Sequence, residues 1–125
     1  MVFAPTNAAF EELGDDVLTC LFAPENIEIL QEILLYHVAE GAFLEQQLLE
    51  RVGLNKKKLL MLNEGTVFVS RAPRRAGVIV GYESNGVVII YEAAIEQPNM
   101  FASNGIAHGI NGLLTPKGTV LYAYF

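Results

Sequence analysis

The order of apolar and polar residues divides this chain into a helical first half and a strand-rich second half. Thr6 is a favourable N-cap for a helix over residues 8–13, and Gly14 is a natural stop for that helix. A second helix is predicted over residues 15–22, because it opens with two acidic residues and its apolar residues recur at near-helical spacing.

The third helical segment carries the strongest apolar stripe. Pro24 fits its first turn, and Gly41 ends it. Between them, apolar residues recur at three- and four-residue steps, which is typical of a buried helix face. This predicted stripe consists of Ile27, Leu30, Ile33, Leu34 and His37. A short fourth helix is predicted over residues 44–52, with Gly53 as its stop.

The second half is rich in β-branched and aromatic residues, separated by turn residues. Asn63-Glu64-Gly65 and Ser84-Asn85-Gly86 have the composition of hairpin turns. Strands are predicted over residues 59–62, 66–70, 78–82, 87–91, 106–114 and 119–124. Helices followed by strands predict an α+β domain with a mainly antiparallel sheet.

Composition narrows the class of protein. A chain of 125 residues with 52% hydrophobic and 18% charged residues can form a packed core. No apolar run approaches the ~20 residues of a transmembrane segment. The net charge of −6 argues against nucleic-acid binding. Cys20 is the only cysteine, so no internal disulfide forms, and no signal peptide opens the chain.

The charges are unevenly distributed along the chain. Residues 1–50 contain ten acidic residues and no Lys or Arg, whereas residues 51–75 contain seven basic residues against Glu64 alone. We call six of these the basic patch: Lys56, Lys57, Lys58, Arg71, Arg74 and Arg75. It is a candidate site for a sulfated or acidic polymer, an anionic lipid surface or an acidic protein. The alternative is that these charges only protect a strand edge from aggregation.

Candidate catalytic groups are few. His37 and His108 are the two histidines, and neither lies in a nucleophile motif. A buried, hydrogen-bonded structural histidine is the better interpretation of each. No glycine-rich phosphate loop occurs, and one cysteine with two histidines makes no convincing zinc site. The sequence therefore predicts no catalytic residue, no cofactor and no metal.

Three segments, residues 2–10, 34–38 and 102–116, together resemble the fasciclin-like domain family. The first is similar to the family's first conserved box, in which a strand runs into a capped helix. The second is similar to its central Tyr-His motif, and the third to its second box. The family-motif residues in this chain are Phe3, Pro5, Thr6, Asn7, Tyr36, His37, Asn104, Gly105 and His108.

The resemblance implies N-terminal helices packed on a mainly antiparallel sheet or β-sandwich wedge. It also implies a non-catalytic adhesion module, extracellular or at the cell surface. Such a module binds other cell-surface or matrix proteins or polysaccharides, associates with itself, and binds no nucleic acid. The alternative is a small-molecule or lipid-binding module that uses an apolar groove between the helices and the sheet.

The chain also departs from the family pattern. It starts inside the first box, so we expect residues 1–125 to form one fasciclin-like domain without the family's N-terminal helices. Apolar surface is then expected around Phe3, Phe10 or the last strand. Gly109 and Asn111 replace a large apolar and an acidic residue of the second box. Residues 97–100 lack the aspartate of a receptor-binding peptide known in some animal members, so integrin recognition is not expected.

Overall fold

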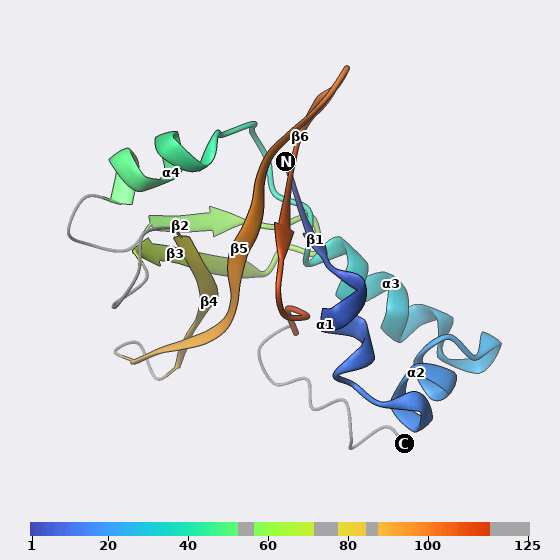
Figure 1. The fold of residues 1–125 in the computed structure, drawn as a ribbon. Coiled ribbons are helices and arrows are strands. Elements are labelled where there is room, and N and C mark those ends of the chain that lie inside the picture. Colours follow the sequence, from blue (N-terminus) through green and yellow to red (C-terminus); the bar gives the residue numbers. More distant parts are fainter. Residues whose placement is uncertain (53–56, 72–77, 85–87, 116–125) are drawn as a thin grey trace.

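The computed structural model describes residues 1–52, 57–71, 78–84 and 88–115. Their elements, in chain order, are β1 (Val2–Pro5), α1 (Asn7–Glu11), α2 (Asp15–Leu21), the 3-10 helix η1 (Pro24–Asn26), α3 (Ile27–Leu35), α4 (Glu45–Val52), β2 (Lys57–Leu60), β3 (Thr66–Arg71), β4 (Val78–Ser84), β5 (Val88–Ala102) and β6 (Gly105–Ile110). The fold is α+β, as predicted. In Figure 1, α1, α2 and α3 gather at one end of the molecule, and α4 lies apart from them.

The strands form one six-stranded sheet in the order β1-β6-β5-β4-β3-β2. All neighbours are antiparallel except β1 and β6, which are parallel. β5 pairs with β4 through its first half and with β6 through its second half, and register shifts between Ile95 and Met100 mark bulges in it. Because bulges bend a strand, β5 joins two differently directed parts of the sheet. Figure 1 shows this long strand crossing the molecule.

The segment after α3 connects the two edges of the sheet. Val38 forms an antiparallel bridge to Val2 of β1, and Ala39 forms one to Met61, directly after β2. The Leu62 N–H donates to the Val38 carbonyl at 2.9 Å. Backbone groups at both edges are therefore satisfied locally by one short segment, which also protects those edges from pairing with other chains.

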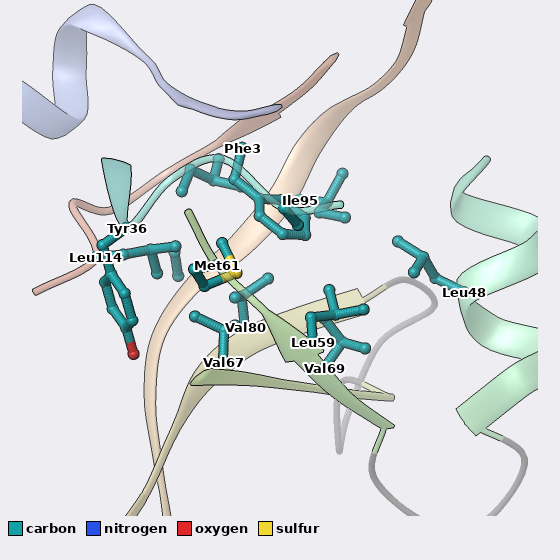
Figure 2. Packing of buried hydrophobic residues seen from close by; sticks show 13 residues of the cluster. Phe3, Tyr36, Leu48, Leu59, Met61, Val67, Val69, Val80, Ile95 and Leu114 are labelled. Carbon is teal, nitrogen blue, oxygen red and sulfur yellow. The ribbon is translucent and has the colours of Figure 1, made fainter. Parts of the chain in front are cut away.

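The main core lies against one face of the sheet. On β3, Val67 and Val69 alternate with half-buried residues and are fully buried, and Val80 of β4 is fully buried as well. Figure 2 shows Leu48 of α4 reaching toward Leu59 of β2. Each such side chain contributes roughly 1.5–3 kcal/mol by leaving water. A second, smaller cluster of Leu21, Leu30 and Ile33 holds α2 against α3.

The prediction for the third helix was wrong in part. The helix begins as η1 and ends at Leu35, so His37 lies in the turn that follows it. Ile27 and Leu34 of the predicted stripe are 49% and 47% exposed. The reason is that α2 covers only one side of α3, the side of Leu30 and Ile33.

Two strand predictions also need correction. The strand expected over 87–91 extends to Ala102, and the strand expected over 106–114 ends at Ile110. Phe3, expected near exposed apolar surface, is fully buried because β6 and the turn after α3 enclose it. Gly53, the Asn85-Gly86 turn and the strand expected over 119–124 lie outside the described residues.

Candidate functional site

The three family-like segments meet where β1 lies beside β6. Phe3 of β1 is aligned with His108 of β6, and their ring centroids are 6.2 Å apart. The Phe3 N–H also donates to the His37 carbonyl at 2.8 Å. Residues that are more than 100 positions apart in the chain thus form one buried site, which we call the motif site.

His37 links three segments of the chain through its imidazole and its carbonyl. Its Nε2 accepts the Leu114 N–H at 2.9 Å, and its Nδ1 lies 2.7 Å from the Ile33 carbonyl. Because a backbone N–H can only donate, Nε2 must be the unprotonated nitrogen and Nδ1 must carry the proton. The ring is therefore neutral, and both of its nitrogens have partners.

Burial lowers the pKa of His37 below its ordinary value of 6.5, and the hydrogen bond to Ile33 opposes this with a smaller effect. The direction follows from physical chemistry, since a side chain that is 3% exposed cannot hydrate its charged form. A proton added to Nε2 would also point at the Leu114 N–H. Both effects keep the ring neutral at physiological pH.

Tyr36 anchors the same turn to β3. Its hydroxyl donates to the Thr66 carbonyl at 2.7 Å, and its side chain is 2% exposed. Gly65 lies directly against the ring, because a Cβ at that position would come within 3.0 Å of the Tyr36 Cε1. The expectation of a buried, hydrogen-bonded histidine is confirmed for His37, and the neighbouring Tyr36 is buried and hydrogen-bonded as well.

The first box forms the predicted strand-to-helix junction. Pro5 ends β1 opposite Ile110 of β6, and the Thr6 N–H donates to the Ile110 carbonyl at 3.0 Å. The Thr6 hydroxyl accepts the Ala9 N–H at 3.2 Å and so caps α1. Asn7 is the first residue of α1 and is exposed.

His108 links β5 to the segment before α4. Its Nδ1 accepts the Asn99 N–H at 3.0 Å, so Nε2 carries the proton and donates to the Phe43 carbonyl at 2.6 Å. The Asn99 side chain in turn accepts the Glu45 N–H at 2.8 Å, at the start of α4. This fully buried histidine thereby positions the entry to α4 against the bulged part of β5.

Asn104 and Gly105 lie at the β5–β6 turn, away from both histidines. Asn104 is exposed, and Gly105 is half-buried at the start of β6. On the adjoining end of β5, Met100 is 39% exposed and Phe101 is 76% exposed. We call residues 100–105 the hairpin tip, and Figure 1 shows the β5–β6 hairpin projecting from the rest of the fold. The motif residues therefore fall into three groups: buried side chains in the motif site, the β1–α1 junction of Pro5, Thr6 and Asn7, and the hairpin tip.

Sequence reasoning missed the structural roles of two asparagines, Asn99 and Asn111. Asn99 adopts a positive φ of 60° beside Pro98, a conformation that asparagine tolerates better than most residues. Asn111 accepts the Ala94 N–H at 2.8 Å and donates to a Glu96 carboxylate oxygen at 3.2 Å. The sequence Pro98-Asn99 could have indicated a turn-like conformation at Asn99. No neighbouring residue indicates the hydrogen bonds of Asn111.

The basic patch is described only in part. Lys57 and Lys58 open β2 and Arg71 ends β3, so their backbones lie at the hairpin end remote from the Asn63–Gly65 turn. The Lys58 side chain is exposed. A common binding surface for all six residues stays a prediction, since three lie outside the described residues: Lys56, Arg74 and Arg75.

The polar side chains of the motif site form hydrogen bonds within the fold. Each histidine uses one nitrogen to accept a backbone N–H and the other to donate to a backbone carbonyl. Within the described ranges, no three His, Cys, Asp or Glu side chains gather closely enough to hold a metal ion. In the same part of the chain, no helix is long and apolar enough to cross a membrane.

The fasciclin domain family model matches residues 2–116. The chain belongs to the fasciclin domain family. This confirms the resemblance drawn from the three segments, which now prove to converge on the motif site. The fold agrees as well: a solved structure of a FAS1 domain pair from the insect cell adhesion molecule Fasciclin I matches with a TM-score of 0.64 at 15% identity, over 98% of this chain and 39% of that one.

Curated relatives resemble this fasciclin domain over most of its length. Human periostin is 26% identical over 117 residues, which are 94% of this chain and 12% of periostin. Two Synechocystis proteins are also similar. Protein sll1483 is 30% identical over 92% of this chain and 54% of its own length. Protein sll1735 is 32% identical over 90% of this chain and 70% of its own length. The chain thus spans about an eighth of periostin and about half of sll1483.

Proposed function

We propose that this chain is a non-catalytic adhesion module, located outside the cell or on its surface. As one fasciclin-like domain over residues 1–125, it binds other cell-surface or matrix proteins or polysaccharides through surface patches. Family membership and the structural similarity to part of an insect cell adhesion molecule support this proposal. Self-association belongs to the same class of function.

The observation that carries the proposal is the hairpin tip. Phe101 is the most exposed large hydrophobic side chain among the described residues, and Met100 adjoins it. Residues 97–116 contain no Asp, Glu, Lys or Arg. A projecting, uncharged hairpin with an exposed aromatic residue suits contact with another protein, where aromatic side chains supply much of the binding energy.

The internal use of both histidines supports a non-catalytic role. A general base needs a nitrogen that can reach a substrate, and His37 and His108 are 3% and 0% exposed. Each is also saturated by backbone partners, so using it as a base would require breaking a buried hydrogen bond. We therefore assign both histidines a structural role.

Cell attachment to the immobilised chain tests the proposal, with an albumin-coated surface as the blank. We expect attachment above the blank and at least a roughly threefold loss with Phe101→Ser, a typical effect for an aromatic contact residue. Leu62→Ser is the matched control, because Leu62 is also a large apolar residue, 51% exposed, but lies beyond β2. Attachment no higher than the blank would refute the proposed function, and equal effects of the two variants would remove the hairpin tip from it.

The polysaccharide arm is tested on a sulfated-polysaccharide column over a salt series. The basic patch predicts retention that falls steeply with salt, because exposed charges are screened over ~8 Å at physiological ionic strength. Replacing all six basic residues by Ser should abolish retention, whereas single replacements should change it little. Unchanged retention of the sixfold variant would assign the patch to strand-edge protection instead.

The alternative function, a ligand in an apolar groove between helices and sheet, is not favoured by the described contacts. Where α4 meets the sheet, Leu48 and Val69 are fully buried and Leu59 is 5% exposed. These side chains belong to one contiguous cluster of buried residues between α4 and the sheet.

A further inference from the structure

Asparagine is followed by glycine at three places in the chain: Asn85-Gly86, Asn104-Gly105 and Asn111-Gly112. In such a pair the glycine nitrogen reaches the side-chain amide carbon of the asparagine easily, because glycine has no Cβ to block the approach. That approach leads to deamidation, the loss of the side-chain amide as ammonia. The first pair lies outside the described residues, whereas the other two lie directly before and directly after β6.

Asn111 is held in place by hydrogen bonds at both ends of its side-chain amide. Its Oδ1 accepts the Ala94 N–H at 2.8 Å, and its Nδ2 donates to a Glu96 carboxylate oxygen at 3.2 Å. Its backbone N–H also donates to the Ala94 carbonyl at 3.1 Å. The side chain would have to break its two bonds to turn toward the Gly112 nitrogen. The fold therefore protects this pair from deamidation.

Asn104 has the opposite surroundings, at the hairpin tip. It is exposed, and its side chain forms no hydrogen bond within the part of the chain that the structure describes. Ser103 and Asn104 form the turn, and Gly105 pairs with Ala102 at the last position of the β5–β6 ladder. A Cβ at Gly105 would meet no atom within 4 Å. Opening this terminal pair, where strand ladders fray most easily, gives the Gly105 nitrogen access to Asn104.

We propose that Asn104 is a deamidation site, and that its conversion reduces binding through the hairpin tip. The reaction follows from the exposed Asn104, its free amide and the open space at Gly105. The loss of binding rests on the proposed adhesive function, whereas the reaction itself does not. Figure 1 shows the β5–β6 hairpin projecting from the fold, so the change occurs on a surface that a partner can reach.

The reaction takes place in two steps and needs only water. The Gly105 nitrogen attacks the Asn104 Cγ, a bond forms between these atoms, and the bond from Cγ to Nδ2 breaks. Ammonia leaves with the proton of the Gly105 N–H, and a cyclic succinimide remains. Water then opens the ring, placing its hydroxyl on the released carboxyl carbon and its other hydrogen on the Gly105 nitrogen. Breaking the new bond gives aspartate, and breaking the original peptide bond gives isoaspartate.

Both products change the hairpin tip. Each carries a carboxylate that is ionised at neutral pH, whereas residues 97–116 contain no charged side chain. Isoaspartate also passes the backbone through Cγ, which lengthens the turn before Gly105. Because strand pairing in a hairpin depends on the length of its turn, the Ala102–Gly105 pair is then lost. The exposed Phe101, next to that pair, no longer has its original position.

The reaction is measured by incubating the full chain in mildly alkaline buffer and mapping its peptides by mass spectrometry. We expect several-fold more aspartate and isoaspartate at Asn104 than at Asn111. In guanidinium chloride the two sites should react at similar rates, because both precede glycine and the protecting hydrogen bonds are gone. Gly105→Ala should slow conversion of Asn104 several-fold, since its Cβ hinders the attack, and the open space at that position accommodates it.

The effect on binding is measured by cell attachment, with each incubated chain compared with its own fresh sample. Incubation should reduce attachment of the parent several-fold and that of Gly105→Ala much less. Because Gly105→Ala retains Asn85, an equal loss in both chains would assign the effect to another residue and overturn the role of Asn104 in binding.

The two parts of the proposal fail separately. Equal conversion of Asn104 and Asn111 in the folded chain, or no conversion of Asn104, would overturn the deamidation site. Full conversion of Asn104 with undiminished attachment would overturn its effect on binding. Fresh parent chain that attaches cells no better than albumin would refute the adhesive function and this effect with it, while the mass-spectrometric result would still decide the site.

Discussion

Replacing His37 by Ala measures how much the fold depends on one buried imidazole. Alanine removes the acceptor of the Leu114 N–H at 2.9 Å and the donor to the Ile33 carbonyl at 2.7 Å. The Ile33 carbonyl keeps the Tyr36 N–H at 3.1 Å as a second partner. Leu114 is fully buried, so its N–H is the group left without a partner.

The expected loss follows from these contacts. A buried donor left unsatisfied costs ~1–3 kcal/mol. The cavity left by the ring adds roughly 1–2 kcal/mol, less than for a larger aromatic side chain. His37→Ala should therefore lower the free energy of unfolding by about 2–5 kcal/mol. Because small domains are stable by only ~5–15 kcal/mol, this loss is a sizeable part of the total.

His37→Gln restores an acceptor for the Leu114 N–H together with most of the volume that alanine removes. A glutamine oxygen can reach the position of Nε2 and accept the Leu114 N–H, so we expect a loss of only about 1–2 kcal/mol. Glu40→Ala is the control at an exposed position, with an expected effect below ~0.5 kcal/mol. Urea unfolding followed by far-UV circular dichroism measures all three.

The reasoning fails if Ala and Gln cost the same within about 0.5 kcal/mol, because the Leu114 bond would then carry no weight. A loss below ~1 kcal/mol for His37→Ala would refute it as well, since an orphaned buried N–H alone should exceed that.

Two further predictions concern pH and a close backbone approach. Burial lowers the pKa of His37 in the folded protein below its ordinary value of 6.5. The stability that depends on the neutral ring is therefore fully present above pH 6.5, and it is lost as the pH falls through the pKa of the folded protein. The stability gap between the parent and His37→Gln should thus narrow toward acid in urea titrations, and a widening gap would contradict this. Gly109→Ala should cost ~1–3 kcal/mol, because its Cβ would lie 2.8 Å from the Gln97 Cβ. Adding Gln97→Gly should recover part of that loss in a double-mutant cycle, and strictly additive effects would exclude the clash.

Local features of this fasciclin domain could be predicted from the sequence because neighbours in the chain decide them. The Thr6 cap of α1 forms within four residues, and the Asn63–Gly65 turn closes through the Asn63 side chain and the Gly65 N–H at 2.9 Å. The alternation of Val67 and Val69 identifies the buried face of β3 in the same way. The α+β class follows from the order of such local patterns.

The extent of β5 was decided by tertiary structure. Pro98 lacks an N–H and normally ends a strand pattern, and the two bulges around Gln97 break the period of two. The strand continues past them because β6 offers partners as far as Ala102, opposite Gly105. The end of β5 cannot be predicted from the residues of β5 alone, because strand β6 supplies the hydrogen bonds that extend it.

The motif site likewise depends on partners far away in the chain. The family resemblance placed Tyr36, His37 and His108 in motifs, and their residue types predicted buried hydrogen bonds. Their actual partners, Thr66, Leu114 and Phe43, lie 30, 77 and 65 residues away. Sequence determines which groups need a partner, because an unpaired buried polar group is costly anywhere. Only the tertiary structure determines which backbone atom forms that hydrogen bond, because contact between distant residues depends on how the whole chain packs.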